Sequence, residues 1–263
     1  MTRIHPTAIV EADCELAEAV EIGPYSVIRH GAVIGPRTII DAHVLVEHAT
    51  LGADNQLSFG VALGGAPQDQ HYRGEPTRVV MGDRNVIREY VTIHRATGEG
   101  GATRVGSGCL VMASSHLGHN CELGDEVCMA TLSGLSGHTI IEDRVIIGGM
   151  VGSHQWVRVG TLAMVSGYSK ISMDVPPFSL VDGKPARVVG PNLVGLRRSG
   201  LSAEARGALQ HAFRTIYRSH LQLKEALART RAELGECPEV LRLVDFLERT
   251  RQGRAGRQQE TAV

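Results

Sequence analysis

The stretch that decides the fold covers residues 105–171 and reads VGSGCLVMASSHLGHNCELGDEVCMATLSGLSGHTIIEDRVIIGGMVGSHQWVRVGTLAMVSGYSKI. Counting in steps of six from Val105, eleven of twelve positions are aliphatic or methionine, and the exception is Ser153. A period of six fits neither an amphipathic helix nor an alternating strand. It is typical of short strands joined by tight turns, three of which form a triangular coil of about 18 residues. The repeat predicts a left-handed parallel β-helix, a mainly β fold whose coils stack at about 4.8 Å.

The same period recurs near the N-terminus. There the aliphatic positions are Val10, Leu16, Ile22, Ile28, Ile34, Ile40 and Val46. A small residue often follows, as in Ile22-Gly23 and Ile34-Gly35, and we expect it to let the chain bend. Only 4% of the 263 residues are aromatic whereas 31 are glycine, so the core must consist of small and β-branched side chains. We therefore expect the β-helix to cover residues 1–190.

Three regions depart from the repeat. The frame is lost near residues 65–79 and again near 95–104, which predicts loops on one face of the column, either functional or merely tolerated insertions. The repeat ends after Pro176-Pro177, and residues from Leu201 onward show helical spacing. Ser202 is the expected N-cap of one helix and Pro238 lies near the start of a second. We expect an α-helical C-terminal domain at residues 191–263, with a frayed polar end.

Charge and composition exclude several classes of function. The net charge of −1 gives no overall attraction to nucleic acid, and no nucleic-acid motif is present. No stretch approaches the roughly 20 apolar residues of a membrane span, and the N-terminus lacks the pattern of an export signal. We therefore expect a cytoplasmic protein without a membrane span. Five cysteines without a C-x-x-C pair indicate neither a disulfide framework nor a cysteine-rich zinc site.

Histidines fall at nearly equivalent places on successive coils. His119, His138 and His154 are about one coil apart, and His116 precedes His119 by three residues. The spacing predicts imidazoles stacked along one edge of the column. Because imidazole exchanges protons near neutral pH, such an edge suggests proton transfer. The alternative is a zinc site of three histidines, as in the hexapeptide-repeat carbonic anhydrases that this architecture resembles.

Several motifs carry a more specific resemblance, over nearly the whole chain, to the UDP-N-acetylglucosamine acyltransferases that begin lipid A biosynthesis. They are HPTAIVE at the N-terminus, GEPTRVVMGDRNVIREYVTIHR at 74–95, HLGHNC at 116–121, IIGGMVGSHQW at 146–156, DVPPFSL at 174–180 and IYRS at 216–219. The resemblance implies a homotrimer with active sites between neighbouring subunits. It also implies transfer of a 3-hydroxyacyl chain from the phosphopantetheine arm of acyl carrier protein to the 3-hydroxyl of the sugar, without a metal or another cofactor.

The resemblance also assigns roles to residues. His119 matches the general base, and Gly137 matches the residue whose backbone N–H faces the developing oxyanion. Gly167 matches the position that limits the length of the acyl chain. Substrate-contacting positions of the family correspond here to Gln68, Asp69, His71, His116, His138, His154, Gln155, Asn192 and Arg198. Arg197, Arg198, Lys184 and Arg187 form a basic group that would meet acyl carrier protein or a diphosphate, or would simply be solvated.

Two positions depart from the family pattern. Asn120 follows the catalytic histidine where the family typically has Asp, so the carboxylate that would support the base is missing at this position. His71 stands where the family usually has Lys, so a permanent cation is absent at this position. Two alternatives therefore stay open: a divergent enzyme that acylates another nucleotide sugar, such as a 3-amino sugar, and a metal-binding or non-catalytic hexapeptide-repeat protein. The sequence also leaves open whether another carboxylate compensates for Asn120.

Overall fold

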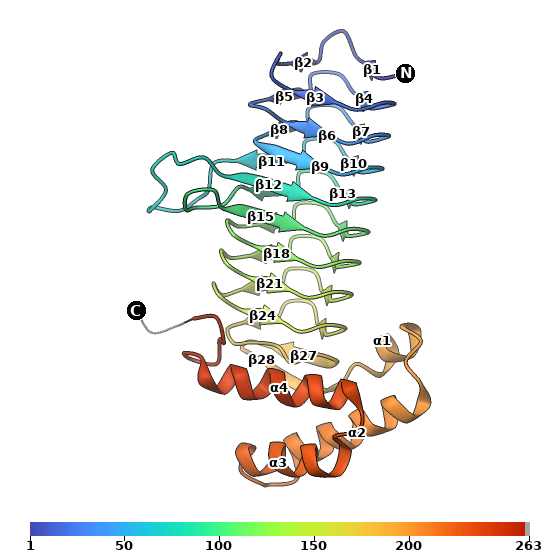
Figure 1. The fold of residues 1–263 in the computed structure, drawn as a ribbon, viewed down its shortest axis with the longest axis vertical. Coiled ribbons are helices and arrows are strands. Elements are labelled where there is room, and N and C mark those ends of the chain that lie inside the picture. Colours follow the sequence, from blue (N-terminus) through green and yellow to red (C-terminus); the bar gives the residue numbers. More distant parts are fainter. Residues whose placement is uncertain (261–263) are drawn as a thin grey trace.

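The structure, a computed structural model, describes residues 1–260 as a column of three-sided coils with helices packed against one end (Figure 1). Each side of the column is one sheet. The first sheet, all parallel except its last pair, contains β1 (Arg3–Ile4), β4 (Glu21–Ile22), β7 (Ile39–Ile40), β10 (Gln56–Leu57), β13 (Val86–Ile87), β16 (Leu110–Val111), β19 (Cys128–Met129), β22 (Ile146–Ile147), β25 (Met164–Val165), β27 (Ser179–Gly183) and β28 (Ala186–Pro191).

The other two sides are entirely parallel sheets. The second sheet contains β2 (Ile9–Val10), β5 (Val27–Arg29), β8 (Leu45–Glu47), β11 (Ala62–Gly65), β14 (Thr92–His94), β17 (His116–Leu117), β20 (Gly134–Leu135), β23 (Gly152–Ser153) and β26 (Lys170–Ile171). The third sheet contains β3 (Glu15–Leu16), β6 (Val33–Ile34), β9 (Ala49–Leu51), β12 (Arg78–Met81), β15 (Ala102–Val105), β18 (Glu122–Leu123), β21 (Ile140–Ile141) and β24 (Arg158–Val159). The chain passes from the first sheet to the second, then to the third, and back to the first.

The expected core positions are buried. Leu117 pairs with Leu135, and Ile141 pairs with Val159, each 18 residues further along the chain. All twelve positions of the frame from Val105 to Ile171 are at most 8% exposed. Ser153, the exception in the sequence, has its hydroxyl 3.0 Å from that of Thr139, so its polar group is satisfied within the column. The predicted repeat is confirmed.

The bend at each corner comes from a residue other than the one expected. Non-glycine residues take up positive φ every six residues, as in Ser114 (58°), Asn120 (58°) and Glu126 (55°). The glycine that directly follows the aliphatic residue serves close packing instead. A Cβ on Gly35 would lie 2.3 Å from the carbonyl oxygen of Gly52 in the next coil. Glycine is therefore needed there because the coils approach so closely, not because of its φ angle.

Both interruptions of the repeat project from one edge of the column. They lie between β11 and β12 and between β14 and β15, where the second sheet passes into the third, and Figure 1 shows them side by side. The loops also bond to each other: the Gly98 N–H donates to Glu75 at 2.8 Å, and the Gly100 N–H donates to the carbonyl oxygen of Pro76 at 3.1 Å. We call this corner the second–third edge.

Four helices follow the last strands: α1 (Leu193–Arg198), α2 (Ala203–Arg218), α3 (Leu223–Leu234) and α4 (Pro238–Gln252). The Ser202 hydroxyl accepts from the Ala205 N–H at 3.1 Å and caps α2, and Pro238 is the first residue of α4, both as expected. Helix α3 was not expected from the sequence, because its buried residues are Ala226, Leu227 and Thr230, of which only one is a large apolar side chain.

The polar end of the chain is anchored as far as residue 260. The Arg257 guanidinium donates to the carbonyl oxygen of Ser172 at 2.7 Å, and the Gln258 N–H donates to Asp174 at 2.8 Å. The expectation of fraying is therefore wrong for this segment, and residues 261–263 of the expected helical domain lie outside the described part. No helix within residues 1–260 is both long and apolar enough to cross a membrane.

Candidate active site

The ring of His119 is held in one orientation at the second–third edge. Its Nδ1 lies 2.9 Å from Oδ1 of Asn120. The amide of Asn120 is itself fixed by the second insertion, because the Thr97 N–H donates to Oδ1 and Nδ2 donates to the Thr97 carbonyl oxygen, both at 3.0 Å. Oδ1 can only accept, so His119 donates through Nδ1–H. The neutral ring therefore keeps the lone pair on Nε2, the atom that a general base requires.

Gly137 lies one coil further on, directly against this ring. A Cβ on Gly137 would be 2.4 Å from Nε2 of His119. This distance is too short for any side chain at position 137 unless the ring of His119 moves. Among residues 1–260, no group accepts a hydrogen bond from the Gly137 N–H. The position combines a free backbone donor with a lone pair on a neighbouring imidazole, as acyl transfer requires.

Asp69, from the first insertion, reaches the same ring. Its Oδ2 lies 3.9 Å from Nδ1 of His119. Its Oδ1 accepts from the His71 N–H at 3.0 Å, and this hydrogen bond is the main reason that the pKa of Asp69 is lowered to about 2. The carboxylate is consequently ionised throughout the physiological range. His71 itself is exposed, with its ring nitrogen 3.1 Å from Asp69.

His138 packs edge-on against His119, with ring centroids 5.2 Å apart. The ring stacked on its other side belongs to Trp156, at 3.7 Å, and not to His154. His154 lies on the predicted edge, between β23 and β24, but its ring is not part of the stack, because the residue 18 positions beyond His138 is Trp156. His154 is exposed and donates from Nδ1 to the carbonyl oxygen of Gln155 at 2.9 Å. Burial lowers the pKa of His138 to about 4.

His94 was not among the expected site residues. With His116, His119 and His138 it forms what we call the imidazole cluster. The ring of His94 meets His116 edge-on at 5.1 Å, and burial lowers the pKa of His94 to about 4. His116 has its Nδ1 2.8 Å from the Thr92 hydroxyl, and burial lowers its pKa as well. The strands of His94 and His116 are neighbours although 24 residues separate Thr92 from His116. The insertion adds six residues to the usual 18, so the regular period could not reveal this contact.

Other expected residues divide into two sets. Gln68 and Gln155 are exposed and lie at the second–third edge, which also carries the buried His119 and the half-buried Asp69. Asn192, Arg198 and Gly167 lie elsewhere. Asn192 donates to the Leu162 carbonyl oxygen at 2.9 Å and caps α1, on the edge where the third sheet passes into the first. Arg198 is exposed at the end of that helix.

Gly167 lies between β25 and β26, on the edge where the first sheet passes into the second. One chain therefore does not bring together all the positions that the resemblance implies. Asn192 and Arg198 share one edge of the column, Gly167 lies on another, and the imidazole cluster occupies the third.

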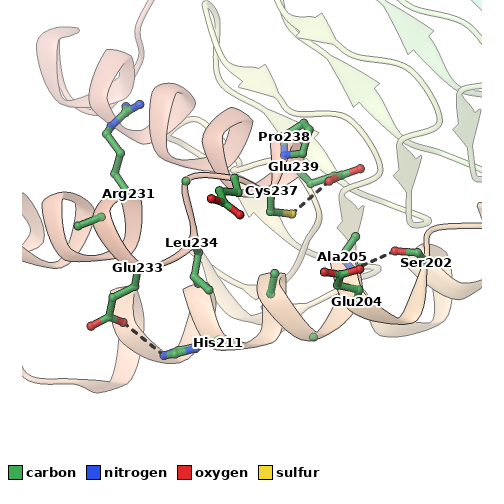
Figure 2. A pocket seen from close by; sticks show the side chains of 15 residues that line it. Ser202, Glu204, Ala205, His211, Arg231, Glu233, Leu234, Cys237, Pro238 and Glu239 are labelled. Carbon is green, nitrogen blue, oxygen red and sulfur yellow. Dashed lines mark hydrogen bonds and ion pairs between the residues drawn. The ribbon is translucent and has the colours of Figure 1, made fainter.

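A cavity of about 930 Å³ opens between α2, α3 and the start of α4 (Figure 2). Its lining includes His211 and Glu233, whose Nε2 and Oε2 atoms are 3.6 Å apart, and Cys237, whose thiol lies 3.2 Å from Glu239. None of the expected site residues lines it. Within residues 1–260, no three His, Cys, Asp or Glu side chains are grouped so that they could hold a metal ion.

Family models match two parts of the chain. Residues 174–255 match the family described as Udp N-acetylglucosamine O-acyltransferase, Domain 2, and residues 13–48 match the Bacterial transferase hexapeptide (six repeats). Two curated proteins named acyl-(acyl-carrier-protein)–UDP-N-acetylglucosamine O-acyltransferase match almost end to end. That of Syntrophobacter fumaroxidans is 45% identical over 95% of this chain and 98% of its own, and that of Paraburkholderia phymatum is 44% identical over 96% and 99%.

Solved structures give the same result. The UDP-N-acetylglucosamine acyltransferase of Bacteroides fragilis superposes with a TM-score of 0.90 at 34% identity, covering 93% of this chain and 96% of its own. The UDP-N-acetylglucosamine O-acyltransferase of Moraxella catarrhalis superposes with a TM-score of 0.86 at 38% identity, covering 92% and 95%. These likenesses, with the hexapeptide match, confirm the predicted left-handed parallel β-helix.

Proposed function

Because the chain belongs to the family of acyl-(acyl-carrier-protein)–UDP-N-acetylglucosamine O-acyltransferases, we propose that it transfers a 3-hydroxyacyl chain from acyl carrier protein to the 3-hydroxyl of UDP-N-acetylglucosamine, the first step of lipid A biosynthesis. The observation that carries the proposal is the fixed ring of His119, whose free Nε2 faces Gly137. The proposed place of action is the cytoplasm.

The chemistry follows from these two groups. Nε2 of His119 removes the proton from the sugar hydroxyl while its oxygen attacks the thioester carbonyl carbon. The carbonyl oxygen becomes negatively charged and accepts a hydrogen bond from the Gly137 N–H. When the intermediate collapses, the carbon–sulfur bond breaks and His119 returns its proton to the departing thiolate of the phosphopantetheine arm. The chain itself supplies the proton transfer and the positioning, with no metal or other cofactor in the proposed route.

A second copy of the chain would complete the site. Asn192 and Arg198 lie on a different edge from His119, so they can meet the same substrate only across a subunit boundary. This placement supports the proposed homotrimer, in which like interfaces repeat around a threefold axis. Gly167 would limit the length of the acyl chain from the edge where the first sheet passes into the second. The exposed side chains of Lys184, Arg187, Arg197 and Arg198 would meet the acidic carrier protein.

The proposal is tested by measuring acyl transfer with purified protein. UDP-N-acetylglucosamine and its 3-amino analogue are each offered with carrier proteins that bear 3-hydroxyacyl chains of several lengths. We expect the hydroxyl sugar to be acylated, and a His119→Ala variant to lose at least about 10²-fold in kcat, the usual worth of a general base. Transfer to the amino sugar alone would move the assignment to the divergent enzyme. Transfer to neither sugar would contradict the proposed function.

A further inference from the structure

The first insertion brings a carboxylate to the side of His119 that faces away from Gly137. We infer that Asp69 is a positioning residue that stabilises the protonated ring of His119, and so supplies the negative charge that Asn120 does not. The inference rests on the proposed function, because it assigns a role within the same proton transfer. Asp69 was expected only among the residues that contact the substrate.

The geometry separates two tasks that one residue could perform. Asn120 fixes the ring through its amide oxygen, 2.9 Å from Nδ1, but an amide carries no charge. Oδ2 of Asp69 lies 3.9 Å from the same nitrogen, too far for a hydrogen bond and close enough for a strong through-space attraction. Its side chain is only 16% exposed, which limits screening by solvent. Orientation and charge thus come from two different residues.

The surroundings of His119 leave Asp69 as its one close anion. Across residues 1–260, no other carboxylate lies within 4.0 Å of a ring nitrogen of His119. The other titratable groups that face it are the imidazoles of His94, His116 and His138, whose pKa values are all lowered, chiefly by burial. These rings are neutral near pH 7 and neither oppose nor replace the charge of Asp69.

The first insertion holds the Asp69 carboxylate in place and in its ionised form. The His71 N–H donates to Oδ1 at 3.0 Å, which leaves Oδ2 turned toward His119. The same hydrogen bond is the main cause of the low pKa of Asp69, about 2. An asparagine at this position would still accept from the His71 N–H through its amide oxygen. Asp69→Asn therefore removes the charge and keeps the loop.

The test moves the charge instead of merely deleting it. Four proteins are compared: wild type, Asp69→Asn, Asn120→Asp and the double variant. With acyl carrier protein and UDP-N-acetylglucosamine, Asp69→Asn is expected to lower kcat about 100-fold, equivalent to about 2.7 kcal/mol at 1.36 kcal/mol per tenfold, with KM changed less than about threefold. In the Asn120→Asp background, where a carboxylate already adjoins Nδ1, the same substitution should cost less than about fivefold.

A substrate-free measurement separates this inference from the proposed function. Diethyl pyrocarbonate reacts with neutral imidazole, and peptide mass spectrometry reports its reaction at His119 alone. At pH 6 we expect His119 to react at least about threefold faster in Asp69→Asn than in wild type, and at the wild-type rate in the double variant, because a nearby anion favours the protonated ring. This result would support the role of Asp69 even if neither sugar nucleotide were acylated.

Asp83→Asn is the matched control. Asp83 likewise accepts a backbone hydrogen bond, from Ala53 at 2.7 Å, but it lies between β12 and β13, on another edge of the column. The Asp83→Asn variant should leave both the kinetic constants and the reaction rate of His119 with diethyl pyrocarbonate unchanged. A raised KM with unchanged kcat in Asp69→Asn would make Asp69 a substrate contact. An equal loss of kcat in both backgrounds, or an unchanged reaction rate of His119, would overturn the inference.

Discussion

At the scale of single residues, the contact between His119 and Gly137 leaves no room for a side chain at position 137. The Cβ of an alanine at Gly137 would lie 2.4 Å from Nε2 and would push the ring away from its position. Since φ at Gly137 is not positive, this substitution strains side-chain packing and not the backbone. We expect Gly137→Ala to lower kcat at least about 100-fold while changing the free energy of unfolding by no more than about 1 kcal/mol.

Gly134→Ala is the control for this prediction. Gly134 lies in β20 of the same coil, and a Cβ there would meet nothing within 4 Å. Steady-state kinetics and a thermal melt of both variants decide the matter. A Gly137→Ala enzyme within about threefold of the wild-type kcat would mean that the close contact has no role in turnover.

The buried imidazoles predict how stability depends on pH. The pKa values of His94 and His138 are lowered to about 4, whereas an unfolded histidine titrates near 6.5. Between these values the unfolded chain binds more protons, so stability is fully present above about pH 6.5 and is lost as the pH falls toward 4. Because the rings are only partly buried, we expect a loss of about 1 kcal/mol per histidine over this window.

Chemical unfolding at pH 7.0, 5.5 and 4.5 measures this loss, and His138→Gln should reduce it relative to wild type. Asp69 does not contribute in this window, because its lowered pKa of about 2 affects stability only below the ordinary carboxylate range near pH 4. The surface residue His5 provides the control variant, His5→Gln. If wild type and His138→Gln lost the same free energy of unfolding, protonation of His138 would not be a cause of the loss.

At the scale of elements, the second insertion acts as a clamp on the turn that carries His119. The backbone N–H and C=O of Thr97 both bond to the side chain of Asn120. Asn120→Ala removes both bonds and the partner of His119 Nδ1 in one change. We expect amide hydrogen exchange in residues 95–101 to quicken at least about tenfold, and kcat to fall, because the loop loses its tether and the ring loses its fixed orientation.

The next corner supplies the comparison for that variant. Glu126 has nearly the same φ angle as Asn120, 55° against 58°, and its side chain is exposed. Glu126→Ala therefore introduces the same backbone cost of alanine at positive φ without touching the second insertion. If both variants exchanged residues 95–101 equally fast, the Asn120 side chain would not be the tether.

Elements differ in how far the sequence predicts them. The strands follow from a strict period, and α2 and α4 follow from Ser202, Pro238 and helical spacing. Helix α3 was not expected because Leu227 is the one large apolar side chain among its three buried residues, so the sequence marks no apolar face there. The anchoring of residues 253–260 was missed for a related reason, since polar partners such as Asp174 lie about 80 residues away in the chain.

At the scale of the whole molecule, the division of the expected residues between edges predicts that subunits share active sites. His119→Ala and Arg198→Ala should each be impaired on their own. In every trimer that contains both kinds of chain, one of the three sites would take an intact His119 from one subunit and an intact Arg198 from its neighbour. We expect the mixture to regain a corresponding fraction of wild-type activity.

Coexpression of two differently tagged His119→Ala chains is the negative control, and tandem affinity purification isolates the mixed trimers. Activity no greater than that of the two variants assayed separately would place His119 and Arg198 in the same subunit's site, or in none. The recovered activity depends on mixed assembly and not on the residual activity of either variant by itself.

The sequence by itself determined the column and the approximate place of His119 on it. A period of six is a local rule, so each coil repeats the same inward residue and the count along the chain gives the edge. Only the tertiary structure decided which groups touch at that edge. The insertions contribute Asp69 and Thr97 to the surroundings of His119 from 50 and 22 residues away, and no period predicts where a loop returns to the column. Such contacts depend on the path of the folded backbone, which is set by the loops' own hydrogen bonds.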